Sequence, residues 1–333
     1  MFEDRSPLLT QSTCGRHHRK HRHRQHSQTH QKRQKNETTE PQKFPEEFNL
    51  CDKVYFIWDQ GKVGACTAHA SIILFMMIRA EAGYSPLVFS RRWLYFMVRF
   101  VNKLRQQNGG KLPDNWYDQT QSKGSIVTDD QGAISDDCLQ VIVTKGCPLE
   151  SSYPYITHES REGIKTPSES LKIEAARYIP PGGAKLYVDR ENGRADGLLL
   201  DPASLLDAIK TQLYRHRRPV IVGFRCYGKS SRDELIRLDS RGFLKIPKKH
   251  KKIIEAHEIV IVGWDDRHQC LVCLNFWGNH WGIQPHRAKT RGYFYMSYKF
   301  AFHVRKLHTG AKQYDQTSDF RTLVMDPFIP KCN

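Results

Sequence analysis

One apolar run constrains the fold of this chain more than any other stretch. Residues 72–78 are all apolar, they follow the sequence DQGKVGACTAHA of residues 59–70, and Gly83 comes soon after them. A helix that is apolar on every side has to be buried on every side, and glycine commonly ends a helix. We therefore predict a fully buried helix that begins near Cys66 and ends before Gly83.

Cys66 lies on the first turn of this predicted helix. Unpaired N–H groups and the helix dipole at an N-terminus stabilise a thiolate, which is the nucleophilic form of cysteine. His257 opens a β-branched run in EAHEIVIVGWDD, and Asn275 precedes two Trp-Gly pairs in LVCLNFWGNHWG. A histidine can accept the thiol proton, and an amide can hold the imidazole in the required tautomer. These three residues are our candidate nucleophile, base and orienting group.

Seven blocks of the sequence, in their order along the chain, resemble the papain-like cysteine peptidases. The resemblance is closer to the compact bacterial and viral branch, with Cys-Thr where papain has Cys-Trp, and it runs from about Phe44 to about Phe300. It implies an α+β fold of two lobes with the active-site cleft between them. A helical lobe would carry Cys66, and an antiparallel, barrel-like β-lobe would carry His257 and Asn275. The blocks are FPEEFNLCDK, DQGKVGACTAHA, FSRRWLYFMVRF, QGAISDDCLQVIVTKGCPLESSYPY, AHEIVIVGWDD, NFWGNHWG and RGYFYMSYKF.

The resemblance also assigns roles next to the catalytic residues. Gln60 stands where the family has its oxyanion-hole glutamine, so its amide and the Cys66 N–H would donate to the developing oxyanion. Trp277 stands where the family has an indole that shields the histidine–asparagine hydrogen bond from water. Read without the resemblance, Gln60 is a turn residue beside Gly61, and Trp277 is a core aromatic.

Three further residues are candidate substrate contacts. In the family the glycine region at Gly132 and Ile134 borders the cleft, although both residues also fit a plain helix N-terminus. Glu258 holds the position that lines the pocket for the substrate side chain two residues before the cut, where a carboxylate favours Arg or Lys. The alternative is that strand alternation turns Glu258 away, toward the lysines between residues 248 and 252.

Three substitutions depart from the family pattern. Ala256 replaces a common glycine before the histidine, Glu258 replaces a small residue after it, and Phe276 replaces the usual serine after the asparagine. None of them removes a catalytic group.

We therefore expect a cysteine endopeptidase that cleaves a protein or peptide substrate by a Cys-His-Asn thiolate mechanism with an acyl-enzyme intermediate. One alternative is a related acyl transferase or deconjugating enzyme that uses the same thioester. The other is a catalytically silent papain-like module whose basic tail binds nucleic acid or another polyanion.

Cysteine usage points to a reducing compartment. The nine cysteines are an odd number at scattered positions, which is not a disulfide framework. Where papain has a disulfide-bonded cysteine this chain has Val63. Cys270 and Cys273 form a C-x-x-C inside an expected strand, and no second pair follows at metal-ligand spacing. We interpret them as buried strand cysteines rather than a zinc or redox site, and we expect no metal and no cofactor.

The formal net charge of +17 is unevenly distributed. Residues 16–35 contain eight Lys or Arg, six His and no acid. Residues 1–43 have too few apolar groups to form a core, so we expect a disordered tail. It either only keeps the protein in solution or binds nucleic acid or another polyanion. Metal binding by its histidines would be opposed by the neighbouring cations.

We expect the peptidase domain to span residues 44–303, followed by a C-terminal extension, residues 304–333, to which we assign no function. Only 65 residues precede Cys66, too few for the folded inhibitory propeptide common in the family. The sequence has no signal-peptide pattern and no apolar run that could span a bilayer. We expect an intracellular protein with no membrane contact, associated with the virion if its source is viral, and the oligomeric state stays open.

Local patterns predict the other elements. Apolar residues recur with a helical period over residues 90–103, and a second helix at residues 135–145 is closed by Gly146. Residues 106–128 are rich in Gly, Gln, Asn and Lys and predict an exposed loop. We also expect a helix at residues 204–214 and antiparallel strands at residues 219–226, 258–263, 270–274 and 293–298.

Overall fold

The computed structural model describes residues 43–158, 165–180, 185–188, 194–195, 198–199, 202–227, 236–245, 253–302 and 318–324. The basic tail before residue 43 and the lysines between residues 248 and 252 lie outside these described residues, as does much of the expected C-terminal extension. The chain from Phe44 onward forms one compact unit. It contains two hydrophobic cores, one among helices and one around a sheet.

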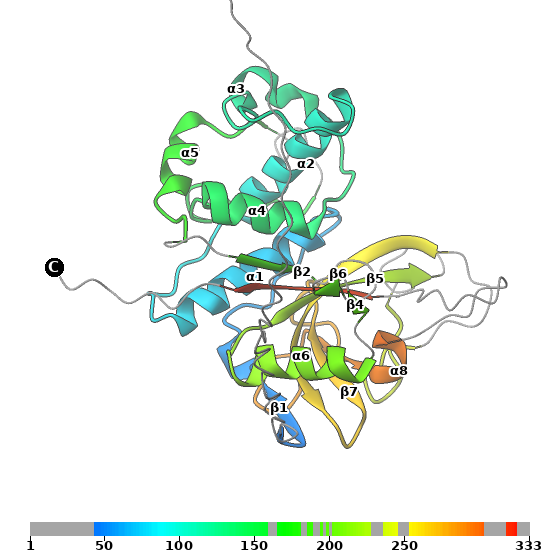
Figure 1. Cartoon of the computed structure of the whole chain (residues 1–333). Helices are drawn as coiled ribbons and strands as arrows, with labels where there is room; N and C mark the ends of the chain where they lie inside the picture. Colours follow the sequence, from blue (N-terminus) through cyan, green and yellow to red (C-terminus); the bar gives the residue numbers. More distant parts are fainter. Residues whose placement is uncertain are drawn as a thin grey trace, which may run out of the picture. The chain divides into compact units, whose positions relative to one another are not determined.

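The first core is enclosed by helices, with α1 between them and the sheet (Figure 1). The α1 helix is buried from Cys66 to Arg79, as its apolar run predicts. The Ser90 hydroxyl caps α2 by accepting the Trp93 N–H at 3.0 Å, which satisfies one of the orphan donors of the first turn. The helices are α1 (Cys66–Glu81), α2 (Arg91–Gln107), α3 (Thr120–Lys123), η2 (Gly124–Ile126), α4 (Ser135–Lys145) and α5 (Glu169–Ala176).

The second core lies against a curled antiparallel sheet with the strand order β2-β9-β5-β6-β7-β8. Strand β6 pairs with β5 along its first part and with β7 and β1 along its last part. This register places His257 opposite Phe224 and Glu258 opposite Gly223. The strands are β1 (Glu47–Asn49), β2 (Lys185–Val188), β5 (Val220–Tyr227), β6 (Ile253–Asp265), β7 (Cys270–Leu274), β8 (Tyr293–Ser297) and β9 (Ser318–Val324).

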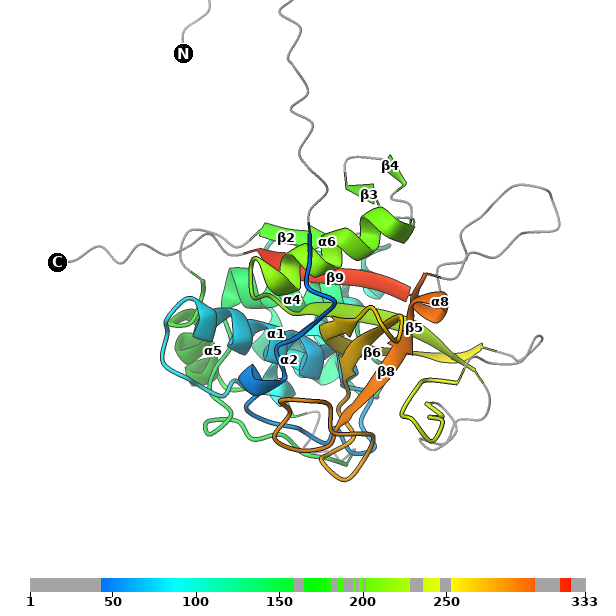
Figure 2. The ribbon, with the colours of Figure 1, turned by 90° about the horizontal axis from the view of Figure 1, so that it is seen from below.

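Short elements complete this lobe. The helix α6 (Pro202–Tyr214) packs against β5 and β6, and its buried residues Leu205, Ile209 and Leu213 recur every four positions along one face. Figure 2 shows α6 beside the sheet, with α8 (Tyr298–Ala301) after β8. The remaining elements are η1 (Cys51–Lys53) and the two-stranded pair β3 (Arg194–Ala195) and β4 (Leu198–Leu199). None of the described helices is both long enough and apolar enough to cross a bilayer.

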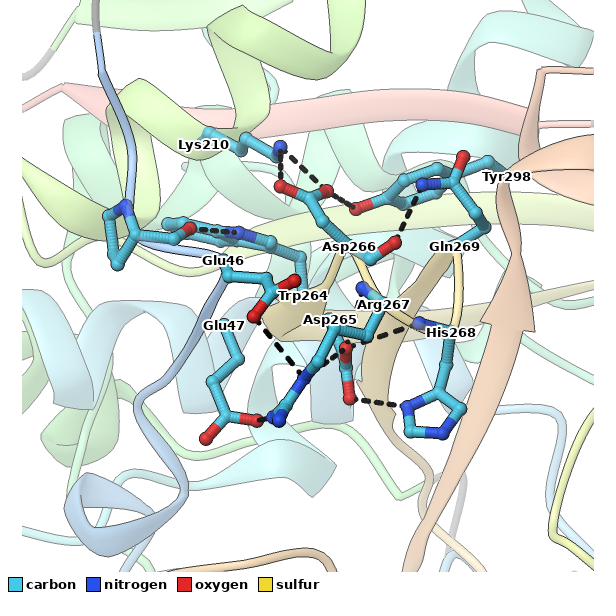
Figure 3. Close-up of polar contacts among 11 residues, drawn as sticks. Glu46, Glu47, Lys210, Trp264, Asp265, Asp266, Arg267, His268, Gln269 and Tyr298 are labelled. Carbon is cyan, nitrogen blue, oxygen red and sulfur yellow. Dashed lines mark hydrogen bonds and ion pairs between the residues drawn. The ribbon is translucent and has the colours of Figure 1, made fainter.

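A polar network ties α6, the turn after β6 and the start of α8 together (Figure 3). The Lys210 ammonium lies 2.8 and 2.7 Å from the two carboxylate oxygens of Asp266. The Tyr298 hydroxyl donates to Asp266 at 2.7 Å. Next to it, the Arg267 guanidinium pairs with Glu47 of β1. The network therefore joins segments that are far apart in the sequence.

Two regions differ from the sequence-based expectation. Residues 106–128 include α3 and η2, and they bury Thr120 and Gly124, whereas the composition predicted an exposed loop. Strand β9 follows residue 303, yet it pairs with β5 and β2 in the main sheet.

Candidate active site

Cys66 is the first residue of α1 and is 9% exposed. The residue before it, Ala65, is the N-cap and makes no side-chain hydrogen bond to the first turn. The N–H groups of the first turn and the helix dipole favour negative charge at this position. The helix α1 packs against β6, the strand that carries His257.

His257 and Asn275 form a buried hydrogen bond between β6 and the end of β7. His257 Nε2 lies 2.8 Å from Asn275 Oδ1, and the two residues are 3% and 0% exposed. A carboxamide oxygen only accepts hydrogen bonds, so Nε2 carries the proton and Nδ1 is left to take one. The asparagine thereby fixes the tautomer that a base needs.

Trp277 covers this pair from one side. Its ring centroid lies 5.2 Å from that of His257, and Trp277 is itself 8% exposed. Trp281 packs edge to face on Trp277, also at 5.2 Å. Water is thereby kept from one side of the His257–Asn275 bond, which strengthens it.

Gln60 lies beside the same segment. Its backbone N–H donates to the Phe276 carbonyl at 2.8 Å, and its side-chain Nε2 donates to the Val63 carbonyl at 2.9 Å. An amide nitrogen has two hydrogens, so one N–H remains for a further acceptor. The turn depends on Gly61, which has a φ of +64° and whose added Cβ would collide with the Thr157 carbonyl.

Tyr155, in the block ESSYPY, holds the Gln60 turn in place through a hydrogen bond. Its hydroxyl donates to the Gln60 carbonyl at 2.9 Å, and its backbone N–H donates to Glu150 at 2.9 Å. Burial raises the pKa of Tyr155, the Arg91 guanidinium opposes this shift, and Cys66 is close enough to add to it. The turn with Gln60 and the start of α1 therefore share one support.

Arg91 and His69 extend that support beneath α1. The Arg91 guanidinium pairs with Glu150 at 2.6 Å and lies over the Trp58 ring at 4.2 Å. His69 Nδ1 lies 2.8 Å from the Ala65 carbonyl, and Nε2 lies 3.3 Å from Arg91 Nη1. A carbonyl only accepts and a guanidinium only donates, so His69 is neutral with its proton on Nδ1. It therefore serves as a structural histidine.

Asp130 joins the loop before Cys66 to the loop before α4. One carboxylate oxygen accepts the Gly64 N–H at 2.7 Å, and the other accepts the Tyr95 hydroxyl. The Tyr95 oxygen in turn accepts the Gly132 N–H at 3.1 Å. Gly132 has a φ of +72° and open space where a Cβ would stand, and Ile134 is 50% exposed. These two predicted substrate contacts thus lie on a loop fixed to the nucleophile loop.

Glu258 faces α4 and is 8% exposed. It accepts a hydrogen bond from the Ser135 hydroxyl, at the first residue of α4 and next to Ile134. Burial raises the pKa of Cys138, one turn further along α4, and the Glu258 charge adds to this effect. The side chain therefore points toward the loop of the candidate substrate contacts. The lysines of the alternative interpretation lie outside the described residues.

The remaining cysteines are structural. No disulfide joins any of the seven cysteines in the described part of the chain. Cys270 and Cys273 are buried in β7, and their odd spacing along a strand turns them to opposite faces. Burial raises the pKa of Cys270 to about 12 and that of Cys273 well above its usual value. Both stay protonated near neutral pH, so they are poor metal ligands.

The comparisons with known proteins agree with this geometry. No family model matches the sequence. An uncharacterized peptidase C1-like protein of Acanthamoeba polyphaga mimivirus is 19% identical over 244 residues, which make up 73% of this chain and 64% of that protein. This chain therefore spans less than two thirds of that relative's length.

The matches to solved structures identify the fold of this chain. Xylellain, a cysteine protease from Xylella fastidiosa, matches with a TM-score of 0.57 at 20% identity, over 85% of this chain and 87% of its own. The chain has the papain-like fold. The proform of the ragweed pollen cysteine protease Amb a 11 matches with a TM-score of 0.50 at 17% identity, over 88% of this chain and 63% of its own. The papain-like fold confirms the α+β architecture, with a helical lobe and an antiparallel β-lobe, that the sequence blocks implied.

Several supporting residues were not predicted from the sequence. Asp130, Arg91 and His69 connect segments that are distant in the chain, and their neighbours in the sequence give no sign of these contacts. The available signal is His69 itself, because it follows Cys66 by three positions and so shares a helix face with it.

Proposed function

We propose that this protein is a cysteine endopeptidase, with Cys66 as nucleophile, His257 as base and Asn275 as the group that orients the base. The observation that carries the proposal is the buried hydrogen bond between His257 Nε2 and Asn275 Oδ1 beneath Trp277. A neutral imidazole whose Nε2 proton is held by an amide oxygen can accept a proton at Nδ1. It is what a thiol nucleophile requires.

Acylation follows from these roles. The Cys66 thiol passes its proton to His257 Nδ1, and the thiolate sulfur attacks the peptide carbonyl carbon. The Cys66 N–H and the remaining Gln60 N–H donate to the oxygen as it becomes negative. The imidazolium then gives its proton to the leaving amine as the C–N bond breaks, which leaves a thioester on Cys66.

Deacylation uses the same groups in reverse. His257 Nδ1 takes a proton from a water molecule, and the resulting nucleophile attacks the thioester carbonyl. The sulfur leaves as a thiolate and is reprotonated by the imidazolium. An amine in place of water would give acyl transfer through the same intermediate, so the acceptor alone distinguishes peptidase from transferase.

Within this proposal, Glu258 selects a basic side chain two residues before the cut. Its burial and its contact with Ser135 put negative charge beside the loop of Gly132 and Ile134. Two peptides that differ only in Leu or Arg at that substrate position test this. We expect the parent to prefer Arg and Glu258→Ala to lose that preference. An Arg preference that survives the substitution would exclude this role.

Covalent labelling tests the proposal itself. An electrophilic peptide probe should modify the parent once per chain, at Cys66, and Cys66→Ala should neither label nor cleave peptides. Cys270→Ala is the matched control, because it removes another buried thiol and should keep both activities. Failure of the folded parent to label or cleave would favour the catalytically silent module, and peptide cleavage by Cys66→Ala would contradict the assignment.

A further inference from the structure

A pocket of about 680 Å³ that three basic residues line lies in the β-lobe, next to Trp281. Its walls are a hairpin at residues 236–245, the loop that carries Trp281, and Arg291. The hairpin docks on the edge of β8, where the Leu244 N–H donates to the Tyr295 carbonyl at 2.8 Å (Figure 2). The pocket is therefore built from ordered segments of the β-lobe.

The hairpin places two cations on one face. The Lys245 N–H donates to the Arg237 carbonyl at 2.8 Å, and Leu238 and Leu244 pair as a bridge beside them. Residues directly opposite in an antiparallel pair extend to the same side. Arg237 and Lys245 are exposed, whereas Leu244 is buried, so the two cations share the solvent side of the hairpin.

Arg291 adds a third cation, and its position is fixed. Its Nε and Nη2 both donate to the Gly282 carbonyl, at 2.9 and 2.5 Å, which leaves further N–H groups for another acceptor. Asp239 is the one acid among the described residues that line the pocket. Its carboxylate accepts hydrogen bonds from the backbone N–H groups of Arg241 and Phe243, each at 2.9 Å, and these donors stabilise its negative charge.

Among the described residues that line the pocket, basic side chains outnumber acidic ones. Three cations and one hydrogen-bonded carboxylate line the pocket, and cations held close together repel one another unless an anion lies between them. Within the described residues, the Lys245 ammonium pairs with no carboxylate. An acidic group is therefore the ligand that fits the pocket.

The pocket lies on the side of the leaving group. Trp281 lines it and packs on Trp277, which in turn packs on His257. His257 has to reach the leaving nitrogen, so the polypeptide beyond the cut passes over the imidazole. This part of the substrate then continues toward Trp277, which packs against the imidazole. The acyl half lies toward Gly132 and Glu258, on the α4 side.

We propose that this pocket binds a carboxylate of the substrate beyond the cut, so that the enzyme prefers substrates with an acidic group there. This inference rests on the proposed peptidase function. The carboxylate is either an Asp or Glu side chain or the free C-terminus of a short leaving segment. Together with Glu258, the pocket gives a cleft that is acidic on one side of Cys66 and basic on the other.

The test uses the full chain and four matched peptides cut at one bond. One carries Glu beyond the cut and an amidated C-terminus, the second has Gln in its place, and two neutral peptides end in a free or an amidated terminus. The first pair tests a side-chain carboxylate, and the second tests a terminal one. We expect kcat/KM to be about tenfold higher for at least one acidic member over its neutral partner. The ratio should shrink as salt is added.

Variants assign the effect to the pocket. Arg237→Gln combined with Lys245→Gln should bring the ratio of kcat/KM between the acidic peptide and its neutral partner close to one. The matched control for Lys245→Gln alone is Arg241→Gln, which also removes one charge from the same hairpin but outside the pocket lining, and it should keep the ratio. Lys245→Gln alone gives the same readout if the double variant unfolds. A parent without acidic preference, or a preference that survives these variants, would overturn the inference.

Binding separates this inference from the proposed function. Full-length Cys66→Ala protein is titrated with each of the four peptides, and the fluorescence of its tryptophans, which include Trp281, is followed. Tighter binding of the Glu peptide, lost in Lys245→Gln, supports the pocket even if the parent cleaves nothing, and then only the peptidase proposal fails. Equal binding of all four peptides contradicts the pocket whether or not the parent cleaves them.

Discussion

At the scale of single residues, the Asp130 carboxylate connects several segments around the candidate active site. It accepts the Gly64 N–H from the loop before Cys66 and the Tyr95 hydroxyl from α2. Through Tyr95 it also holds Gly132. One side chain thus fixes the nucleophile loop relative to the candidate substrate loop.

Asp130→Asn tests this arrangement. An amide has one accepting oxygen instead of two, so one of the two donors loses its partner, at a cost of about 1–3 kcal/mol in the free energy of unfolding. We also expect kcat/KM to fall on the order of 100-fold, because small displacements of reacting groups are costly. Thermal unfolding and peptide hydrolysis measure the two effects.

Asp129→Asn is the control for that substitution. Asp129 is the neighbouring carboxylate, and it pairs with Lys103 at the surface. Its loss should leave both the unfolding temperature and kcat/KM nearly unchanged. Equal effects of the two substitutions would mean that Asp130 has no special role.

Single residues also show how far a sequence alone can be interpreted. Cys66, His257 and Asn275 could be proposed from the sequence because each lies in a distinctive local block, and the chemistry of a thiol nucleophile requires partners of these types. Asp130 and Arg91 were not, because their partners are 66 and 59 positions away in the sequence. Such contacts depend on how the elements pack and leave no periodic signal in the sequence.

At the scale of elements, the block ESSYPY acts as a brace for the catalytic loop. Glu150 pairs with Arg91 at the start of α2 and accepts the Tyr155 N–H, while the Tyr155 hydroxyl holds the Gln60 carbonyl. Breaking the ion pair would leave the Arg91 guanidinium, 8% exposed, without its counter-charge.

Glu150→Gln should therefore lower the free energy of unfolding by about 3 kcal/mol. It should lower kcat more than it changes KM, because the turn that positions Gln60 loses its brace. Glu47→Gln is the control, since Glu47 and its partner Arg267 are 53% and 51% exposed and loss of that pair should leave the free energy of unfolding nearly unchanged. Chemical denaturation and steady-state kinetics measure the effects, and similar losses in both variants would argue against a brace.

Elements with strong local signals matched their predicted bounds best. The helix predicted at residues 135–145 is α4, closed by Gly146 as its sequence indicates, and the buried helix after Cys66 is α1. Most of residues 106–128 are exposed, as their polar composition predicted, but α3, η2 and the few buried positions within them were not foreseen. The burial of Gly124 depends on distant chain, since its added Cβ would meet the Thr166 side chain. Strand β9 was missed because pairing with β5, not its own pattern, makes it a strand.

At the scale of the whole molecule, residues 44–49 are tied to the β-lobe by aromatic contacts. The Phe44 ring packs edge to face on Trp264 and Tyr214, and Phe48 packs on both as well. The Asp266 N–H donates to the Glu46 carbonyl at 2.8 Å. Residues 44–49 therefore belong to the β-lobe core.

Two truncations test these contacts. Removal of residues 1–43 should leave the unfolding temperature and the cleavage of short neutral peptides unchanged, because every contact of Phe44 and Phe48 is kept. Removal of residues 1–49 should destabilise the protein by several kcal/mol, since two aromatic side chains leave the core. Loss of peptide cleavage after removal of residues 1–43 would show that the tail belongs to the active unit.

We propose that the tail binds polyanions. Residues 16–35 carry eight cations and no acid, and phosphate backbones release counterions when such segments bind. Removal of residues 1–43 should weaken retention on nucleic acid and flatten its dependence on salt. Retention that is equal before and after truncation would place any polyanion site in the folded unit instead.

The most direct test of the central claim is to trap the acyl-enzyme. An activated ester of a short peptide is mixed with the protein, and the intact mass is followed in the first turnovers. We predict the addition of one acyl group per chain, mapped to the Cys66 thiol and discharged by water, with formation much slower in His257→Ala. An acyl group on another residue, or full turnover of the ester by Cys66→Ala, would contradict the mechanism.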